Sequence, residues 1–184
     1  MTSILKVDTI QDTDGNNIIN ESGNTITIGA SGDTTNIIGT LQNDGSALVT
    51  GKVLQVVSTA NTSAITGNNT SFADSGFSVT ITPSATSSKI LILTQIAAFN
   101  DTTATSMYYS IYRGTTNLAG ASGFVRTYNG GSNLGSSVAM NFLDSPSTTS
   151  ATEYSVYVKV NAGIGYISVN DSTSTITALE IEGW

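Results

Sequence analysis

The 184-residue sequence contains no cysteine and no histidine. The lack of cysteine excludes a disulfide framework and thiolate chemistry. The lack of histidine excludes Ser-His-Asp and Cys-His nucleophile arrangements and most zinc sites. The sequence also has no glycine-rich phosphate loop with its lysine and no GxGxxG motif after a strand. We therefore expect no cofactor and no metal site, and the commonest kinds of enzyme are excluded.

Charge is also scarce. Charged residues make up 10% of the chain, and six Lys and Arg against 13 Asp and Glu give a net charge of -7. The basic residues are scattered, so we expect no nucleic-acid partner. No segment approaches the roughly 20 consecutive apolar residues of a membrane span, and the amino terminus lacks a secretory-signal pattern. The sequence therefore predicts no membrane insertion.

Aromatic residues are absent from the first part of the chain. All of them lie from Phe72 onward, and both prolines, Pro83 and Pro146, lie there too. The first 50 residues contain only small aliphatic and polar side chains. This change in composition predicts two parts, an N-terminal segment of residues 1–50 and a C-terminal head of residues 51–184.

The head has a strand pattern. Short segments of alternating apolar and polar residues are separated by Gly, Asn, Ser and Pro, as is typical of half-buried antiparallel strands. The eight expected strands are 53–58, 77–82, 89–97, 107–113, 136–143, 153–160, 164–169 and 175–182. With no convincing helical period, the sequence predicts an all-β fold, a jelly-roll-like antiparallel β-sandwich.

One expected strand departs from simple alternation. The run Ile90–Leu93 is apolar at every position, so both of its faces need cover. The second cover is either a subunit interface or a loop of the same chain.

Residues 1–50 contain too little apolar surface to offset the entropy of ordering them in a lone chain. Two outcomes remain: an extended docking segment, or an intertwined β stalk of identical copies. The stretch Asp14–Ile19 is echoed by Asp33–Ile38, which slightly favours the stalk, and a homotrimer is its most natural arrangement. The expected interface residues are Ile18, Ile19, Ile26, Ile28, Ile37 and Ile38.

Two acidic motifs are candidates for catalysis or metal binding. Glu180 and Glu182 lie two apart on the last expected strand, and a glycosidase needs only two carboxylates, but such a pair usually marks a solvated face. The stretch "DTDGNN" (12–17) opens like a calcium loop. Asn17 and Gly23 stand where that loop needs Gly and Glu, so a turn is favoured.

The remaining candidate is a recognition surface. The loop "RTYNGGSN" (126–133) combines a flat ring with guanidinium and amide donors, which suits sugar hydroxyls and ring faces. Its alternative is a plain turn between two strands. In "MYYSIYR" (107–113) one tyrosine stripe could stack on a ligand, or pack against another sheet or subunit. The candidate ligand-binding residues are Arg126, Tyr128, Asn129, Asn133, Tyr108 and Tyr112.

Several stretches resemble a known class of protein. "SILKVDTIQ" (3–11) followed by Asp14-Gly15 resembles the amino-terminal signature of tail-fibre and related structural proteins of bacteriophages, especially marine ones. "GKVLQVVST" (51–59), "SVTITPSATSSKILIL" (78–93) and "ITALEIEGW" (176–184) are similar to the globular parts of such proteins.

The resemblance implies a homotrimeric fibre of the virion. Its amino-terminal end would attach to other virion structural proteins, and we assign this contact to Leu5, Val7 and Ile10. The head would bind a host-surface glycan or protein. Two alternatives stay open, a purely architectural virion decoration or tail component without a receptor role, and, less favoured, a glycan-cleaving tailspike.

Overall fold

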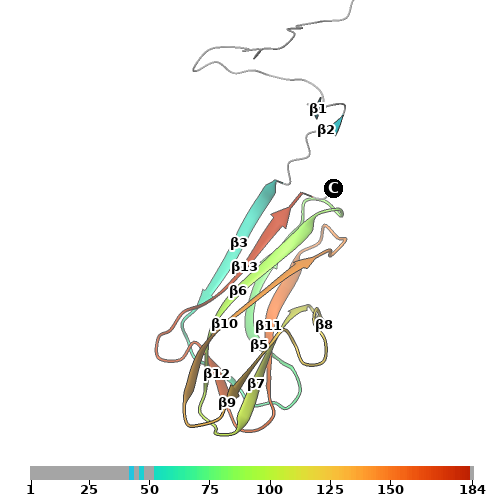
Figure 1. The fold of residues 1–184 in the computed structure, drawn as a ribbon. Helices are drawn as coiled ribbons and strands as arrows, with labels where there is room; N and C mark the ends of the chain where they lie inside the picture. Colours follow the sequence, from blue (N-terminus) through green and yellow to red (C-terminus); the bar gives the residue numbers. More distant parts are fainter. Residues whose placement is uncertain (1–41, 44–45, 48–51, 183–184) are drawn as a thin grey trace, which may run out of the picture. The chain divides into compact units, whose positions relative to one another are not determined.

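A computed structural model describes residues 42–43, 46–47 and 52–182 (Figure 1). The elements fall into two units that are described separately, β1 and β2 in the first and β3 to β13 in the second. In the first unit, β1 (Gln42–Asn43) pairs antiparallel with β2 (Ser46–Ala47).

The predicted attachment and stalk residues lie outside the described residues, as does the predicted division at residues 50 and 51. These assignments stay predictions. The residues concerned are Leu5, Val7, Ile10, Ile18, Ile19, Ile26, Ile28, Ile37 and Ile38.

The second unit consists of two antiparallel sheets. In the large sheet, β6 (Lys89–Asn100) pairs along one edge with β10 (Leu134–Asp144). The first part of the other edge of β6 pairs with β13 (Ser174–Ile181), and β13 pairs in turn with β3 (Val53–Asn61). The last part of the same edge pairs with β12 (Gly165–Ile167), and β12 pairs in turn with β4 (Ile65–Gly67). In the small sheet, β11 (Thr152–Val160) lies between β5 (Ala73–Ile81) and β7 (Thr105–Arg113). The outer edge of β7 pairs with β9 (Val125–Asn129) and β8 (Thr116–Asn117).

The pairing follows a simple rule. Of the long strands, the first in sequence (β3) pairs with the last (β13), β5 with β11, β6 with β10, and β7 with β9. Successive pairs alternate between the two sheets, so the chain is one long hairpin rolled over itself, which is the jelly-roll arrangement. Figure 1 shows β3, β13, β6 and β10 side by side in one layer. The expected all-β jelly-roll sandwich is confirmed.

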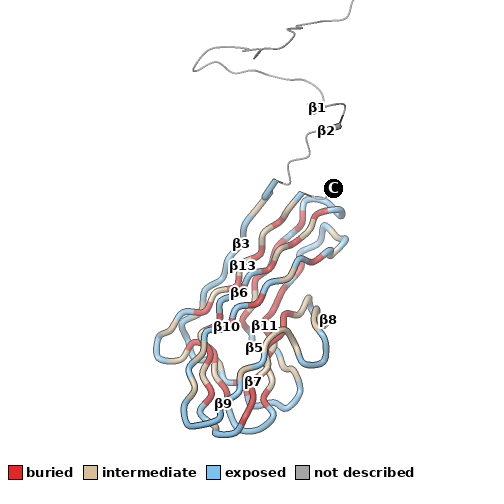
Figure 2. Tube along the Cα trace, in the orientation of Figure 1, coloured by how far each residue is buried: buried red, intermediate tan, exposed pale blue. Residues whose placement is uncertain are grey.

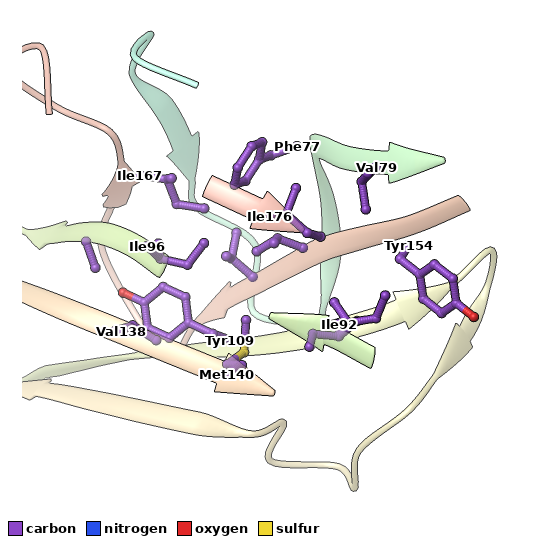
Figure 3. Close-up of a cluster of buried hydrophobic side chains, with 14 of the residues drawn as sticks. Phe77, Val79, Ile92, Ile96, Tyr109, Val138, Met140, Tyr154, Ile167 and Ile176 are labelled. Atoms are coloured by element: carbon purple, nitrogen blue, oxygen red, sulfur yellow. The ribbon is translucent and has the colours of Figure 1, made fainter. Parts of the chain in front are cut away.

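The core lies between the sheets. Alternate residues are buried along β13 and β6, as the burial colours in Figure 2 show. Figure 3 shows Ile92, Ile96 and Ile176 of the large sheet facing Phe77 and Tyr109 of the small sheet. Each fully buried aliphatic or aromatic side chain contributes about 1.5–3 kcal/mol, and this contribution compensates for the lack of disulfides.

Glu180 on β13 is a buried carboxylate that joins three elements. The Gln55 amide on β3 donates to its Oε2 at 2.6 Å, and the backbone N–H and hydroxyl of Ser84 donate to its Oε1 at 2.7 and 2.6 Å. Burial acts to raise the pKa of Glu180, but these hydrogen bonds outweigh it and lower the pKa to about 2. The expected solvated face is therefore wrong for Glu180, which is 0% exposed, whereas Glu182 is exposed.

The described residues contain no helix of the length and apolar character that crossing a bilayer would require.

Candidate recognition surface

The outer face of the small sheet brings aromatic and basic side chains together from separate parts of the sequence. In the strand register, Tyr108 on β7 lies opposite Lys159 on β11 and opposite Arg126 on β9. The result is a cross-strand row of cation, ring and cation. We call the outer-face residues of this region the aromatic surface, which comprises Phe72, Tyr108, Tyr112, Arg126, Tyr128, Tyr157 and Lys159.

Both cations lie over ring faces. The guanidinium carbon of Arg126 is 5.7 Å from the ring centroids of Tyr108 and of Tyr128. The Lys159 Nζ is 4.6 Å from the centroid of Phe72 and 4.9 Å from that of Tyr108. Each such contact is worth about 0.5–1 kcal/mol at an exposed site, enough to orient a long side chain without burying its charge.

Arg126 keeps most of its donors available. Its Nε donates to the Ser106 hydroxyl at 2.9 Å, which fixes the plane of the guanidinium group. In the part of the chain that the structure describes, the one ion pair is formed by Arg113 and Asp144, so Arg126 has no carboxylate partner there. Its two terminal nitrogens can therefore donate to a ligand carboxylate or to sugar hydroxyls.

Tyr112 is engaged in a stack on its own sheet. Its ring lies 3.7 Å from the ring of Tyr157 on β11, at an interplanar angle of 11°. The ring of Phe72 also lies near Tyr112, at 6.0 Å between centroids and an interplanar angle of 57°. Burial in this cluster raises the pKa of Tyr112 and, with help from Asp74, that of Tyr157. Of the tyrosine stripe, Tyr108 lies in the cationic row and Tyr112 in the adjoining stack.

The predicted loop at 126–133 is part strand and part turn. Residues up to Asn129 belong to β9, and only 130–133 form the turn to β10. Tyr128 is 55% exposed on the aromatic surface. Placing the whole segment in one loop was wrong, because pairing with β7 extends its first half.

The two asparagines of this segment differ. Asn129 is 2% exposed, and its amide donates to the carbonyls of Asn100 at 3.0 Å and Thr102 at 3.1 Å. Its Oδ1 accepts from the Gly131 N–H, so Asn129 fixes the turn and does not face solvent. Asn133 is exposed in the turn with a φ of 58°, and its ligand role stays a prediction.

Sequence reasoning missed Phe72, Tyr157 and Lys159. Lys159 is 51 positions from Tyr108 along the chain but directly opposite it in the sheet, and no local pattern encodes that register. One signal was available: Tyr157 and Lys159 alternate with the core residues Val156 and Val158, which places them on the outer face.

The described residues hold no group of three acidic side chains that could bind a metal ion. The aromatic surface offers ring faces and hydrogen-bond donors, the groups that contact planar or hydroxyl-bearing ligands.

The sequence matches no protein-family profile and no curated protein sequence. The fold is similar to solved structures of infectious bursal disease virus. For the VP2 subviral particle the identity is 12%, the TM-score is 0.40, and the match covers 82% of this chain and 44% of that one. For the T=1 particles derived from the same virus, the identity is 12%, the TM-score is 0.41 and the coverages are 81% and 41%. The chain thus spans less than half the length of these chains.

Proposed function

We propose that this protein is a structural component of a phage virion, a short fibre protein whose β-sandwich head binds a glycan on the host surface. In this proposal the aromatic surface is the binding site, and the amino-terminal segment attaches the protein to other virion proteins. The head acts by reversible binding and carries out no reaction.

The row Lys159–Tyr108–Arg126 is the observation that carries the binding role. Sugars present apolar C–H faces that stack on rings, and hydroxyls or carboxylates that accept hydrogen bonds. Tyr108 and Tyr128 supply rings, and the terminal nitrogens of Arg126 supply donors between them. A surface with both kinds of group within one row fits such a ligand.

Two further observations support a virion role. The motifs at residues 3–11 and 176–184 resemble phage fibre proteins. The jelly-roll topology recurs in viral capsid and lectin domains, although a fold alone does not determine a function.

The binding strength of one head need not be high. Cation–π and stacking contacts contribute about 0.5–1.5 kcal/mol each, which gives weak single-site affinity. Several copies on one particle raise the overall avidity by about 10²–10⁴ when they bind together.

Adsorption of the purified full-length protein to host cells tests the proposal. Tyr108→Ala and Arg126→Gln should each weaken binding about tenfold, the effect of losing about 1.4 kcal/mol. Thr80→Ala, on an exposed position of β5 away from the row, is the matched control and should bind like the unaltered protein. Circular dichroism verifies that every variant keeps its sheet structure.

Treatment of the cells identifies the ligand class. Loss of adsorption after periodate oxidation supports a glycan, whereas loss only after protease treatment points to a protein receptor. If both variants adsorb as well as the control, the aromatic surface has no receptor role and the architectural alternative is preferred.

A further inference from the structure

The outer face of the large sheet carries no charge over most of its extent. Outward residues alternate with inward residues at positions 54–60 of β3, 175–181 of β13, 91–99 of β6 and 135–143 of β10. None of these outward residues is Asp, Glu, Lys or Arg, and Lys89, opposite Ile181, lies at the edge of the surface. We call this surface the uncharged face.

An apolar row crosses the uncharged face at the end where β3 begins. The register aligns Val56 with Leu179, Leu179 with Leu91, and Leu91 with Leu143, so the row spans all four strands. Val56 is 57% exposed and Leu143 is 46% exposed. An exposed apolar row continuous across a sheet is typical of a surface that another protein covers.

The opposite side of the sandwich has a different character. The outer face of the small sheet carries Asp74, Glu153, Lys159 and Arg126. The chain as a whole has a net charge of -7, so two copies repel each other at long range. The uncharged face is where two copies can meet without placing like charges in contact, and this identifies a second copy as the best-matched occupant.

The size of the face agrees with this assignment. Four strands at about 4.8 Å spacing, each about 27 Å long over eight residues, give about 500 Å² per copy. Two copies would bury about 1,000 Å², the area at which specific interfaces begin. Residues 1–50, which are predicted to intertwine, directly precede β3 in the sequence, and intertwining of two copies would raise the local concentration of their heads.

We propose that the heads of two copies of this chain pack against each other through the uncharged face. The aromatic surface lies on the opposite sheet and stays open in such an assembly. The interface is therefore independent of the proposed ligand, and either proposal can fail alone.

The lack of cysteine makes a labelling test direct. Ala139→Cys places one thiol on the uncharged face, and Thr80→Cys places one on the opposite outer face; both positions are exposed in a single head. In the full-length protein we expect a maleimide to react with Ala139→Cys at least about tenfold more slowly, because the interface covers it. Adding Leu93→Lys should restore the rate, since a charge on this face opposes packing, whereas adding Ser78→Lys on the opposite face should leave it slow.

Light scattering separates the occupants. The proposal is supported if the Ala139→Cys thiol is labelled slowly in a particle of at least twice 18.9 kDa and if adding Leu93→Lys speeds up that labelling. Slow labelling in a monomer of 18.9 kDa overturns it, because another part of the same chain then covers the face. Equal labelling of the two thiols also overturns it, because the face is then open.

Discussion

The guanidinium group of Arg113 donates to both carboxylate oxygens of Asp144, at 2.9 and 2.7 Å. Arg113 lies on β7 of the small sheet and Asp144 on β10 of the large sheet, so this ion pair joins the two layers. The Tyr154 hydroxyl, on β11, donates to the same carboxylate at 2.7 Å. A single carboxylate therefore connects three strands.

Arg113→Met should destabilise the fold by about 1–3 kcal/mol. The change leaves the carboxylate of Asp144, whose side chain is 8% exposed, without its cationic partner. Breaking a fully buried pair costs about 3–5 kcal/mol, and the 31% exposure of Arg113 reduces that cost. Urea unfolding measures the difference, with the exposed Lys52→Met as control. Equal unfolding midpoints would show that the ion pair contributes nothing.

Two buried tyrosines should respond in opposite ways to loss of the hydroxyl. Tyr154→Phe removes the donor to Asp144 and should cost about 1.5–3 kcal/mol, because the acceptor is charged. Tyr109 is 0% exposed, and its hydroxyl lies near the Thr127 side chain without a hydrogen bond of good geometry to any described residue. Tyr109→Phe should therefore be neutral or stabilising by up to about 1 kcal/mol. Thermal unfolding of the two variants decides this, and a destabilised Tyr109→Phe would reveal a partner for that hydroxyl.

Glu180 should make the stability depend on pH in the acid range. Its pKa is about 2 in the folded protein against 4.5 for the free group, so its stabilising effect is complete above pH 4.5 and is lost as pH falls towards 2. At pH 7, Glu180→Gln should cost about 1.5–3 kcal/mol, since the amide keeps one accepting oxygen and its NH2 group then faces a donor of either Gln55 or Ser84.

The cost of Glu180→Gln should be smaller at pH 2.5 than at pH 7. Acid removes part of the stabilisation that the ionised carboxylate gives the unaltered protein, so the substitution then has less to remove. Urea midpoints at the two pH values measure this, and the exposed Glu182→Gln is the control. A cost of Glu180→Gln that is the same at both pH values would refute the assigned direction of the pKa shift.

Two glycines with similar backbone angles should tolerate alanine differently. Gly123 and Gly76 have φ values of 72° and 74°, where a side chain costs about 1–2 kcal/mol. A Cβ at Gly76 would meet nothing within 4 Å, whereas one at Gly123 would lie 2.8 Å from the Phe72 ring and against the Tyr109 carbonyl. Gly123→Ala should therefore cost at least about 1 kcal/mol more than Gly76→Ala in urea unfolding. Equal costs would mean that the loop shifts freely.

The sandwich could be predicted from sequence because most of its strands have alternation that is visible locally. In the run Ile90–Leu93, Ile90 and Ile92 lie on the core face and are 0% exposed, whereas Leu93 on the other face is 42% exposed, so the expected second cover is not supplied by the described residues of this chain. The β9 strand was missed because its five residues between glycines gain their extended form from pairing with β7. That pairing is a tertiary effect, whereas Gly130 and Gly131 form the turn that their sequence indicates.

The candidate surface was harder to predict than the fold. Arg126, Tyr128 and Tyr108 were found from their chemistry, but their neighbour Lys159 depends on a long-range register. The prediction of a solvated position for Glu180 was wrong for a different reason. Glu180 continues the inward series of Ile176 and Ala178, so the alternation placed it in the core, but its charge favoured the surface. The hydrogen bonds that permit its burial come from distant residues, Gln55 and Ser84.

The pairing of β3 with β13 also determines how the sandwich carries mechanical load. The Glu182 N–H donates to the Lys52 carbonyl at 2.9 Å, so both ends of the described domain lie together at one end of an antiparallel ladder. A pull on Lys52 and Glu182 in opposite directions would open this ladder one hydrogen bond at a time, in the manner of a zipper. A pull between Lys52 and the turn at 130–133 would instead load the long β6–β10 pairing along its length, so many hydrogen bonds share the force. A head held at Lys52 and loaded at the far turn is therefore stressed along its stronger direction.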